Sequence, residues 1–170
     1  MATDFLIQGG HRRIAHIAGW QGSSTGRDRR QGFEAAMEAA GLTPFAVIDG
    51  MYKRPIAMQC ARQLATGTAR PDAIFVGNDH MAFGVIDALR DLGPTPGKDI
   101  SIVGYDDVPL AAWEAYDLTT VRQPVNRMVD ATVTILMDQI ENRASSPETT
   151  EIEGELILRS SARIPEGWTT

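Results

Sequence analysis

The chain has 170 residues, with 16 basic and 22 acidic side chains and a formal net charge of −6. This length suits one ordinary globular domain, and the acidic balance argues against strong nucleic-acid binding by these residues, because such binding depends on clustered Lys and Arg. The single cysteine excludes an internal disulfide, so we expect a reducing, cytoplasmic setting.

The first ten residues, MATDFLIQGG, do not predict an export signal. Asp4 stands where a signal peptide is basic, and the apolar run is interrupted almost at once. No apolar stretch of the chain reaches the length of a membrane span. We therefore expect neither a signal peptide nor contact with a membrane.

Short β-branched runs alternate with helical stretches along the first hundred residues. Strands are predicted at 14–18, 45–48, 73–76 and 100–104, and helices at 27–40, 55–66 and 79–92. Successive strands begin about 30 residues apart, which is the length of a βαβ unit. This alternation predicts an α/β fold with a parallel β-sheet flanked by helices.

The pattern changes after residue 105. An irregular stretch precedes a short predicted strand at 119–122, and a long helix follows at 126–142. Apolar residues recur along this helix every three or four positions and form one stripe, at Val125, Val129, Val133, Leu136 and Ile140. A polar linker is predicted at 144–150 and a last strand at 155–159.

Polar side chains follow each of the four predicted parallel strands, where ligands bind in open α/β sheets. In chain order these turns carry Trp20, Thr25, Arg29, Met51, Tyr52, Asn78 and Asp106. Guanidinium, amide and carboxylate groups beside apolar walls suit a small polar ligand such as a sugar. For single residues the alternative stays open that Asn78 and Asp79 cap a helix and that Asp106 and Asp107 form a turn.

Residues 22–26, GSSTG, match the G-x-S-x-G motif of serine hydrolases. In that motif the serine sits directly at a strand end and the histidine follows the acid in the chain. Here Ser24 follows the predicted strand by several residues, and the last histidine, His80, precedes Asp106. The histidines and Cys60 lack metal-ligand spacing, and the glycines match no nucleotide-binding motif. We expect no catalysis, no metal and no cofactor.

Several motifs resemble the LacI/GalR family of bacterial transcription regulators. They are GHRRIA at 10–15, RxxGF at 29–33, AIFVGND at 73–79 with AxG at 82–84, DISIVGYDD at 99–107, and LTTV at 118–121 with QP at 123–124. The resemblance implies an incomplete two-subdomain core of the periplasmic-binding-protein-like type I fold. It assigns 1–122 to the C-terminal effector-binding subdomain, 123–150 to a helix and linker of the other subdomain, and 151–170 to a return strand and tail.

The resemblance also implies an effector in the cleft between the subdomains. Carried over by position, the lining residues are Thr25, Arg29, Met51, Asn78, Asp106 and Gln123, and Trp20 and Tyr52 are further candidate walls. Arg29 and Asp106 are the main polar clamps in this comparison. Met51 stands where the family often has an aromatic residue, so the effector stays open between a sugar, which we expect, and a purine or another small molecule.

The implied function is effector sensing in a DNA-binding transcription regulator, through cleft closure and homodimerisation. The resemblance places helix 81–92 and loop 110–116 near the two-fold axis. The helix-turn-helix that binds operator DNA, and about half of the effector core, have no counterpart before Met1, so we expect a fragment whose apolar stripe is covered by self-association. The alternative is the substrate-binding protein of a sugar ABC transporter, which shares the architecture.

Overall fold

The computed structural model describes residues 1–141 and 150–168. Within them, one six-stranded sheet has the order β2-β1-β3-β4-β5-β6. Its strands are β1 (Ile14–Ala18), β2 (Ala46–Asp49), β3 (Ala73–Val76), β4 (Ser101–Asp106), β5 (Thr119–Arg122) and β6 (Glu155–Ile157). Neighbouring strands pair in parallel except β5 and β6, which are antiparallel. The α/β fold with a mostly parallel sheet is confirmed.

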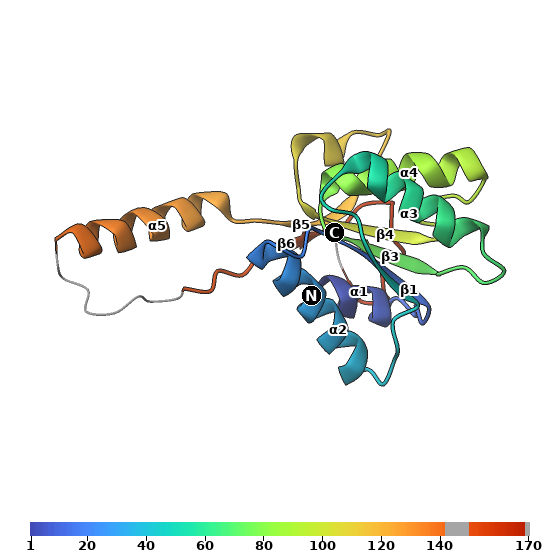
Figure 1. Cartoon of the computed structure of the whole chain (residues 1–170), viewed down its shortest axis with the longest axis horizontal. Coiled ribbons are helices and arrows are strands. Elements are labelled where there is room, and N and C mark those ends of the chain that lie inside the picture. The colour runs from blue at the N-terminus through green and yellow to red at the C-terminus, as the bar shows by residue number, and fades with distance from the viewer. Residues whose placement is uncertain (142–149, 169–170) are drawn as a thin grey trace.

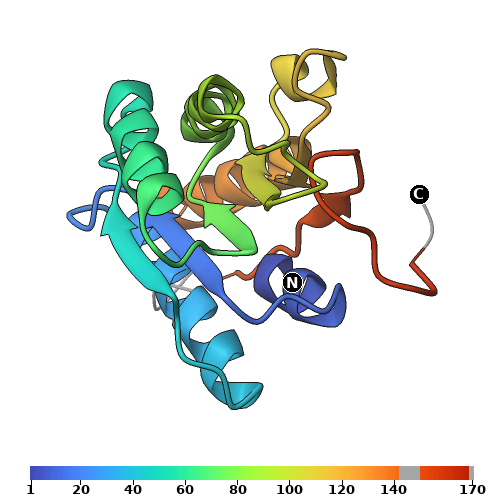
Figure 2. The same ribbon diagram turned by 90° about the vertical axis from the view of Figure 1, so that its right-hand side faces the viewer.

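Helices cover both faces of the sheet. The helical elements of the described residues are α1 (Ala2–Gln8), α2 (Ser24–Ala39), α3 (Arg54–Thr66), α4 (Asp79–Leu92), the 3-10 turn η1 (Pro109–Ala112) and α5 (Val125–Ile140), and the first four cover the sheet. Figure 2 shows α1 and α2 on one side of the sheet and α3 and α4 on the other. The parallel connections therefore bury the central strands on both faces.

The ends of these helices follow from local chemistry. The Ser23 side chain accepts a hydrogen bond from the Gly26 amide at 3.1 Å and caps α2, which begins three residues earlier than predicted. Pro55 occupies the first turn of α3, where its missing N–H costs nothing. Gly93 ends α4 with φ of 103°, a left-handed conformation that glycine adopts readily.

Every residue of β1 and β3 is buried. Alternate residues of β3 enter two separate core clusters, because successive side chains of a strand point to opposite faces. Ile74 packs with the residues of α3 and α4, and Phe75 packs with Phe5 and Phe33 from α1 and α2. The core thus fixes the strand register that brings the carboxyl ends of the strands to one edge.

The N-terminal helix and the end of the last strand differ from the prediction. No helix is predicted at 2–8, yet α1 buries Phe5 and Leu6 completely. The last strand ends at Ile157 rather than 159, because Arg159 turns inward and donates to the Leu118 carbonyl at 2.7 Å. That strand is antiparallel to its neighbour. The predicted linker 144–150 lies outside the described residues except for Thr150.

Helix α5 projects from the body of the molecule (Figure 1). None of its side chains is buried, and its apolar stripe is exposed. The helix ends two residues before its predicted limit, at Ile140. In the described part of the chain, no helix combines the length and the hydropathy that crossing a membrane requires.

Candidate functional site

Three of the predicted site residues meet at the carboxyl edge of the sheet. The Arg29 guanidinium lies 3.2 Å from Asp106 Oδ1, and Gln123 Nε2 donates to the same oxygen at 2.6 Å. A second Arg29 nitrogen donates to the Gly77 carbonyl at 2.6 Å. Since α2, β4 and the segments after β3 and β5 each supply one of these residues, the fold itself assembles the cluster.

The cluster of Arg29, Asp106 and Gln123 is only partly shielded from solvent. The Arg29 side chain is 12% exposed and Asp106 26% exposed. The guanidinium carbon lies 3.8 Å from the centre of the Tyr105 ring, which packs against its flat face. A guanidinium has five N–H donors and a carboxylate about four acceptor sites, so the pair keeps hydrogen-bonding capacity for a polar ligand.

Asp106 and its neighbour Asp107 point into different networks. Both have positive φ, 121° and 53°, a region that non-glycine residues rarely adopt. Asp106 faces Arg29, whereas Asp107 is almost buried and pairs with Arg122 at 2.6 Å and Arg159 at 2.8 Å. Asp106 is the last residue of β4 and belongs to the polar cluster, whereas Asp107 lies just after the strand and is paired outside the cluster.

Asp79 is a residue whose role the sequence does not reveal. Its carboxylate is fully buried and accepts hydrogen bonds from Thr120 Oγ1 at 2.6 Å and from the Val108 amide at 3.0 Å. Burial raises the pKa of Asp79, although these two bonds act in the opposite direction. Through these two bonds Asp79 connects Val108, just after the Asp106 end of β4, to Thr120 in β5. Strand β5 leads on to Gln123.

The other predicted site residues lie at the same edge but outside this cluster. The Asn78 side chain accepts from the Met81 amide at 3.0 Å and caps α4, which was the open alternative for this residue. The Tyr52 hydroxyl donates to Thr25 Oγ1 at 3.4 Å. Trp20 is 51% exposed and Met51 37% exposed. The structure leaves these two apolar side chains accessible to a ligand.

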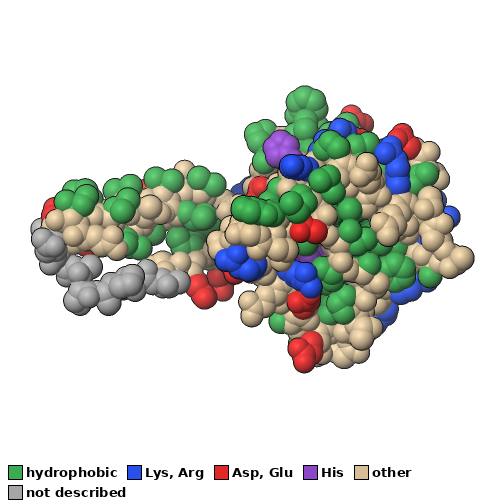
Figure 3. All heavy atoms as spheres, in the orientation of Figure 1, with side chains coloured by type: hydrophobic (Ala, Val, Ile, Leu, Met, Phe, Trp, Pro, Cys, Tyr) green, Lys and Arg blue, Asp and Glu red, His purple; other side chains and the backbone are tan. Residues whose placement is uncertain are grey.

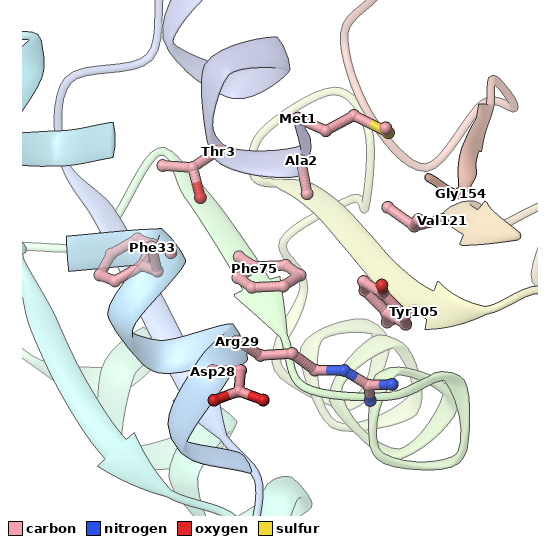
Figure 4. A pocket seen from close by; sticks show the side chains of 11 residues that line it. Met1, Ala2, Thr3, Asp28, Arg29, Phe33, Phe75, Tyr105, Val121 and Gly154 are labelled. Carbon is pink, nitrogen blue, oxygen red and sulfur yellow. The ribbon is translucent and has the colours of Figure 1, made fainter. Parts of the chain in front are cut away.

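Two hollows flank the cluster. A cavity of about 270 Å³ lies beside Arg29 and Tyr105, with Phe33, Phe75 and the start of α1 on its walls (Figure 4). A groove of about 480 Å³ has Asp106 and Gln123 at its base, and the first turns of α5 form its apolar wall. Polar groups at the edge of an apolar hollow are the usual composition of a small-molecule site.

A metal site is not formed by the described residues, which contain no group of three or more His, Cys, Asp or Glu placed to hold an ion. His16, for example, is fully buried and stacks on Phe33 and Phe75. Burial lowers the pKa of His16 to about 4, so this histidine is a neutral core residue at physiological pH.

The family model of the periplasmic binding protein-like domain matches residues 3–162. The chain belongs to this family. Among curated proteins it is similar to the HTH-type transcriptional repressor PurR of Yersinia enterocolitica, with 36% identity over 163 residues, and to that of Haemophilus influenzae, with 37% over 168 residues. These alignments cover 95% and 96% of this chain but 48% and 50% of the relatives, so the chain spans about half their length.

Solved structures agree with the family assignment of this periplasmic-binding-protein-like domain. The Lac repressor dimer bound to operator and the anti-inducer ONPF has a TM-score of 0.89 and 27% identity, and covers 95% of this chain and 56% of its own. The complex of the transcriptional regulator CelR with cellobiose has a TM-score of 0.88 and 33% identity, over 94% of this chain and 50% of its own. The predicted resemblance to LacI/GalR regulators is confirmed. These relatives are named as repressors and regulators, not as enzymes.

Proposed function

We propose that this chain is the effector-sensing domain of a LacI-type transcription regulator and that it performs no catalysis. The observation that carries the proposal is the cluster of Arg29, Asp106 and Gln123 at the carboxyl edge of a sheet shared with such regulators. An effector that closes the cleft shifts DNA affinity by its differential binding to two states, typically about 1–3 kcal/mol.

The proposed effector is a sugar. Arg29 and Asp106 offer paired donors and acceptors to vicinal hydroxyls, with Gln123, Asn78 and Thr25 at the same edge. Trp20, Met51 and Tyr52 supply the apolar walls of this site. A related regulator, CelR, has been solved with cellobiose, which favours a sugar here. A purine is the second candidate, because the same polar groups can pair with ring nitrogens and carbonyls.

The proposed partners are those of the family. A homodimer would form through α4 and the segment 110–116, and operator DNA would be bound by a helix-turn-helix outside the residues of this chain. We further propose that 1–122 form the C-terminal subdomain and that α5 belongs to the other one, in a cytoplasmic protein. A transporter's binding protein is not favoured, because the relatives found are named as regulators.

A thermal-shift screen tests the effector class. The 170-residue chain is heated with monosaccharides, disaccharides, sugar phosphates and purines, since a ligand that binds only the folded state raises the melting temperature. We expect a saccharide to raise it and Asp106→Ala to abolish the effect, while Asp91→Ala, which changes an exposed carboxylate on α4, leaves it intact. A shift with purines alone would overturn the sugar proposal, and a shift that survives Asp106→Ala would overturn the site.

A further inference from the structure

Asp107 is a nearly buried carboxylate next to the candidate site. Its side chain is 6% exposed, although an ionised carboxylate is far more stable in water than in a protein interior. Arg122 Nε donates to its Oδ2 at 2.6 Å, and Arg159 Nη2 lies 2.8 Å from its Oδ1. Each carboxylate oxygen therefore has a positive charge beside it, as a buried ion requires.

The pairing of Asp107 runs alongside the pairing of Asp106. At the ends of β4 and β5, Asp106 and Arg122 are partners in the parallel register. From there, two consecutive residues of one segment bind two consecutive residues of the other. Asp107 accepts from Arg122, and Asp106 accepts from Gln123 at 2.6 Å. Because one short piece of backbone carries both carboxylates, holding Asp107 also fixes the direction of Asp106.

The backbone at these two positions needs such a hold. Asp106 and Asp107 have φ of 121° and 53°, and residues other than glycine keep these conformations only where their surroundings impose them. The partners of Asp106 are groups of the candidate site, Arg29 and Gln123, which an effector would engage. The partners of Asp107 lie outside that cluster, so their hold on the backbone does not depend on an effector.

Arg159 connects Asp107 to the core of the sheet. Its side chain is 13% exposed, and Nη1 donates to the Leu118 carbonyl at 2.7 Å. Its backbone amide donates to Thr119 Oγ1 at 2.9 Å, and this hydroxyl donates to the Arg159 carbonyl at 2.8 Å. Leu118 and Thr119 are completely buried. The guanidinium that faces Asp107 is thus fixed by the interior of the domain.

Asp107 also lies where the chain leaves the sheet toward α5 and where it returns. Arg122 is the last residue of β5, which precedes α5, and Arg159 follows β6, which comes after α5. Arg122 is the register partner of Glu155 at the start of β6, and their charged groups are 3.7 Å apart. Figure 3 shows acidic and basic side chains together where α5 joins the body of the molecule. One carboxylate therefore contacts both connections of α5.

We propose that Asp107 is a positioning residue of the candidate effector site. Its two arginine pairs hold the neighbouring Asp106 carboxylate toward Arg29, and Asp107 itself is not a ligand of the effector. The role in effector binding rests on the proposed function, whereas the positioning of Asp106 is a property of the fold. The positioning is therefore testable without an effector.

A double-mutant cycle measures the interaction that Asp107 is proposed to support. Urea denaturation of the wild type, Arg29→Ala, Asp106→Asn and the double variant gives the coupling between Arg29 and Asp106. The cycle is repeated in an Asp107→Asn background. Asn tolerates the left-handed conformation, so this variant should fold, but its NH2 group meets an arginine where a carboxylate oxygen was. We expect coupling in the wild-type background and loss of at least half of it with Asp107→Asn.

The matched control is the pair of Arg30 and Glu34, which are 2.8 Å apart on the exposed side of α2. Their coupling, from the cycle of Arg30→Ala and Glu34→Ala, should be equal in the two backgrounds. A lower stability of the whole fold changes neither coupling, because a cycle takes differences within one background. A loss confined to the Arg29–Asp106 pair is therefore not produced by a purely structural role of Asp107.

Arg159→Gln gives a second variant, which removes one partner of Asp107 and should also reduce the Arg29–Asp106 coupling. An Arg29–Asp106 coupling that is absent from the wild type, or that Asp107→Asn leaves unchanged, would overturn the proposal. If Asp107→Asn does not fold, the coupling with Arg159→Gln decides in the same way. A coupling that falls as expected in a chain that no saccharide or purine stabilises would support the positioning and contradict only the proposed effector.

Discussion

Arg29 and Asp106 lie 3.2 Å apart although 77 positions separate them in the chain. The contact exists because the parallel sheet brings the start of α2 and the end of β4 to one edge. Arg29 makes three different interactions there, with Asp106, with the Gly77 carbonyl and with the Tyr105 ring. A planar guanidinium can satisfy all three at once, and no other side chain has this geometry.

Replacing Arg29 with lysine should therefore destabilise the fold. A lysine ammonium cannot bond to Gly77 and Asp106 together while stacking on Tyr105, so we expect Arg29→Lys to lower the free energy of unfolding by about 1–2 kcal/mol. Urea denaturation measures this change. The matched control is Arg30→Lys. The Arg30 side chain is half-exposed and pairs with Glu34 in the same helix, so this change should alter stability by less than about 0.5 kcal/mol.

Two glycines should respond to alanine with opposite signs. A Cβ at Gly104 would overlap Asp79 Oδ1 and lie 2.9 Å from Leu118, so Gly104→Ala should lower the free energy of unfolding by about 1–3 kcal/mol. Gly32 lies within α2, and a Cβ there meets open space. Gly32→Ala should raise the free energy of unfolding by about 0.5–1 kcal/mol, because glycine lowers helix stability. If Gly104→Ala changed the free energy of unfolding by the same amount as Gly32→Ala, the side chains of Asp79 and Leu118 would have moved to make room for the new methyl group.

His16 should make the fold sensitive to acid. Its pKa is about 4 in the fold against 6.5 in the unfolded chain, so the unfolded state binds the proton first as the pH falls. The free energy of unfolding should fall by about 3 kcal/mol between pH 6.5 and pH 4 through this residue. In His16→Phe the decline over this window should be smaller by that amount. His80→Gln changes an exposed histidine and should retain the full decline.

Asp79 should have the opposite dependence on pH. Its pKa is raised in the fold, so the folded state holds a proton that the unfolded state has already lost. The contribution of Asp79 to stability is present below the unfolded pKa and is lost as the pH rises through the folded pKa. Asn can accept from the Val108 amide and donate to Thr120, so Asp79→Asn should fold.

Denaturation of the wild type and Asp79→Asn at a series of pH values checks this. Relative to the variant, the wild type should lose stability as the pH rises above the unfolded pKa of Asp79, and the difference should then level off. A flat difference for Asp79→Asn would show that its carboxylate is ionised equally in both states.

The strands and the polar edge were predictable because they depend on local pattern. β3 and β5 have the predicted bounds, since β-branched runs between turns determine them. The proximity of Arg29, Asp106 and Gln123 followed from two sources, the convergence of strand ends and the family motifs.

Other features depend on packing that no local pattern reports. Helix α1 is only seven residues long, and its Phe5 and Leu6 lie completely buried in the core. The dipeptide Asn78–Asp79 indicates a helix cap, and Asn78 is one. Whether Asp79 is buried depends on Thr120 and Val108, which are 41 and 29 positions away in the chain.

The most direct test of the central claim measures effector affinity at the Arg29–Asp106 pair. With the compound that gives the largest thermal shift, calorimetric titration compares the wild-type chain with Arg29→Ala, Asp106→Ala and the control Arg62→Ala, which lies on α3. Each lost charged hydrogen bond is worth about 1.5–3 kcal/mol, so both site variants should bind at least about tenfold more weakly and the control should bind as the wild type does. Unchanged affinity in both site variants would contradict the account.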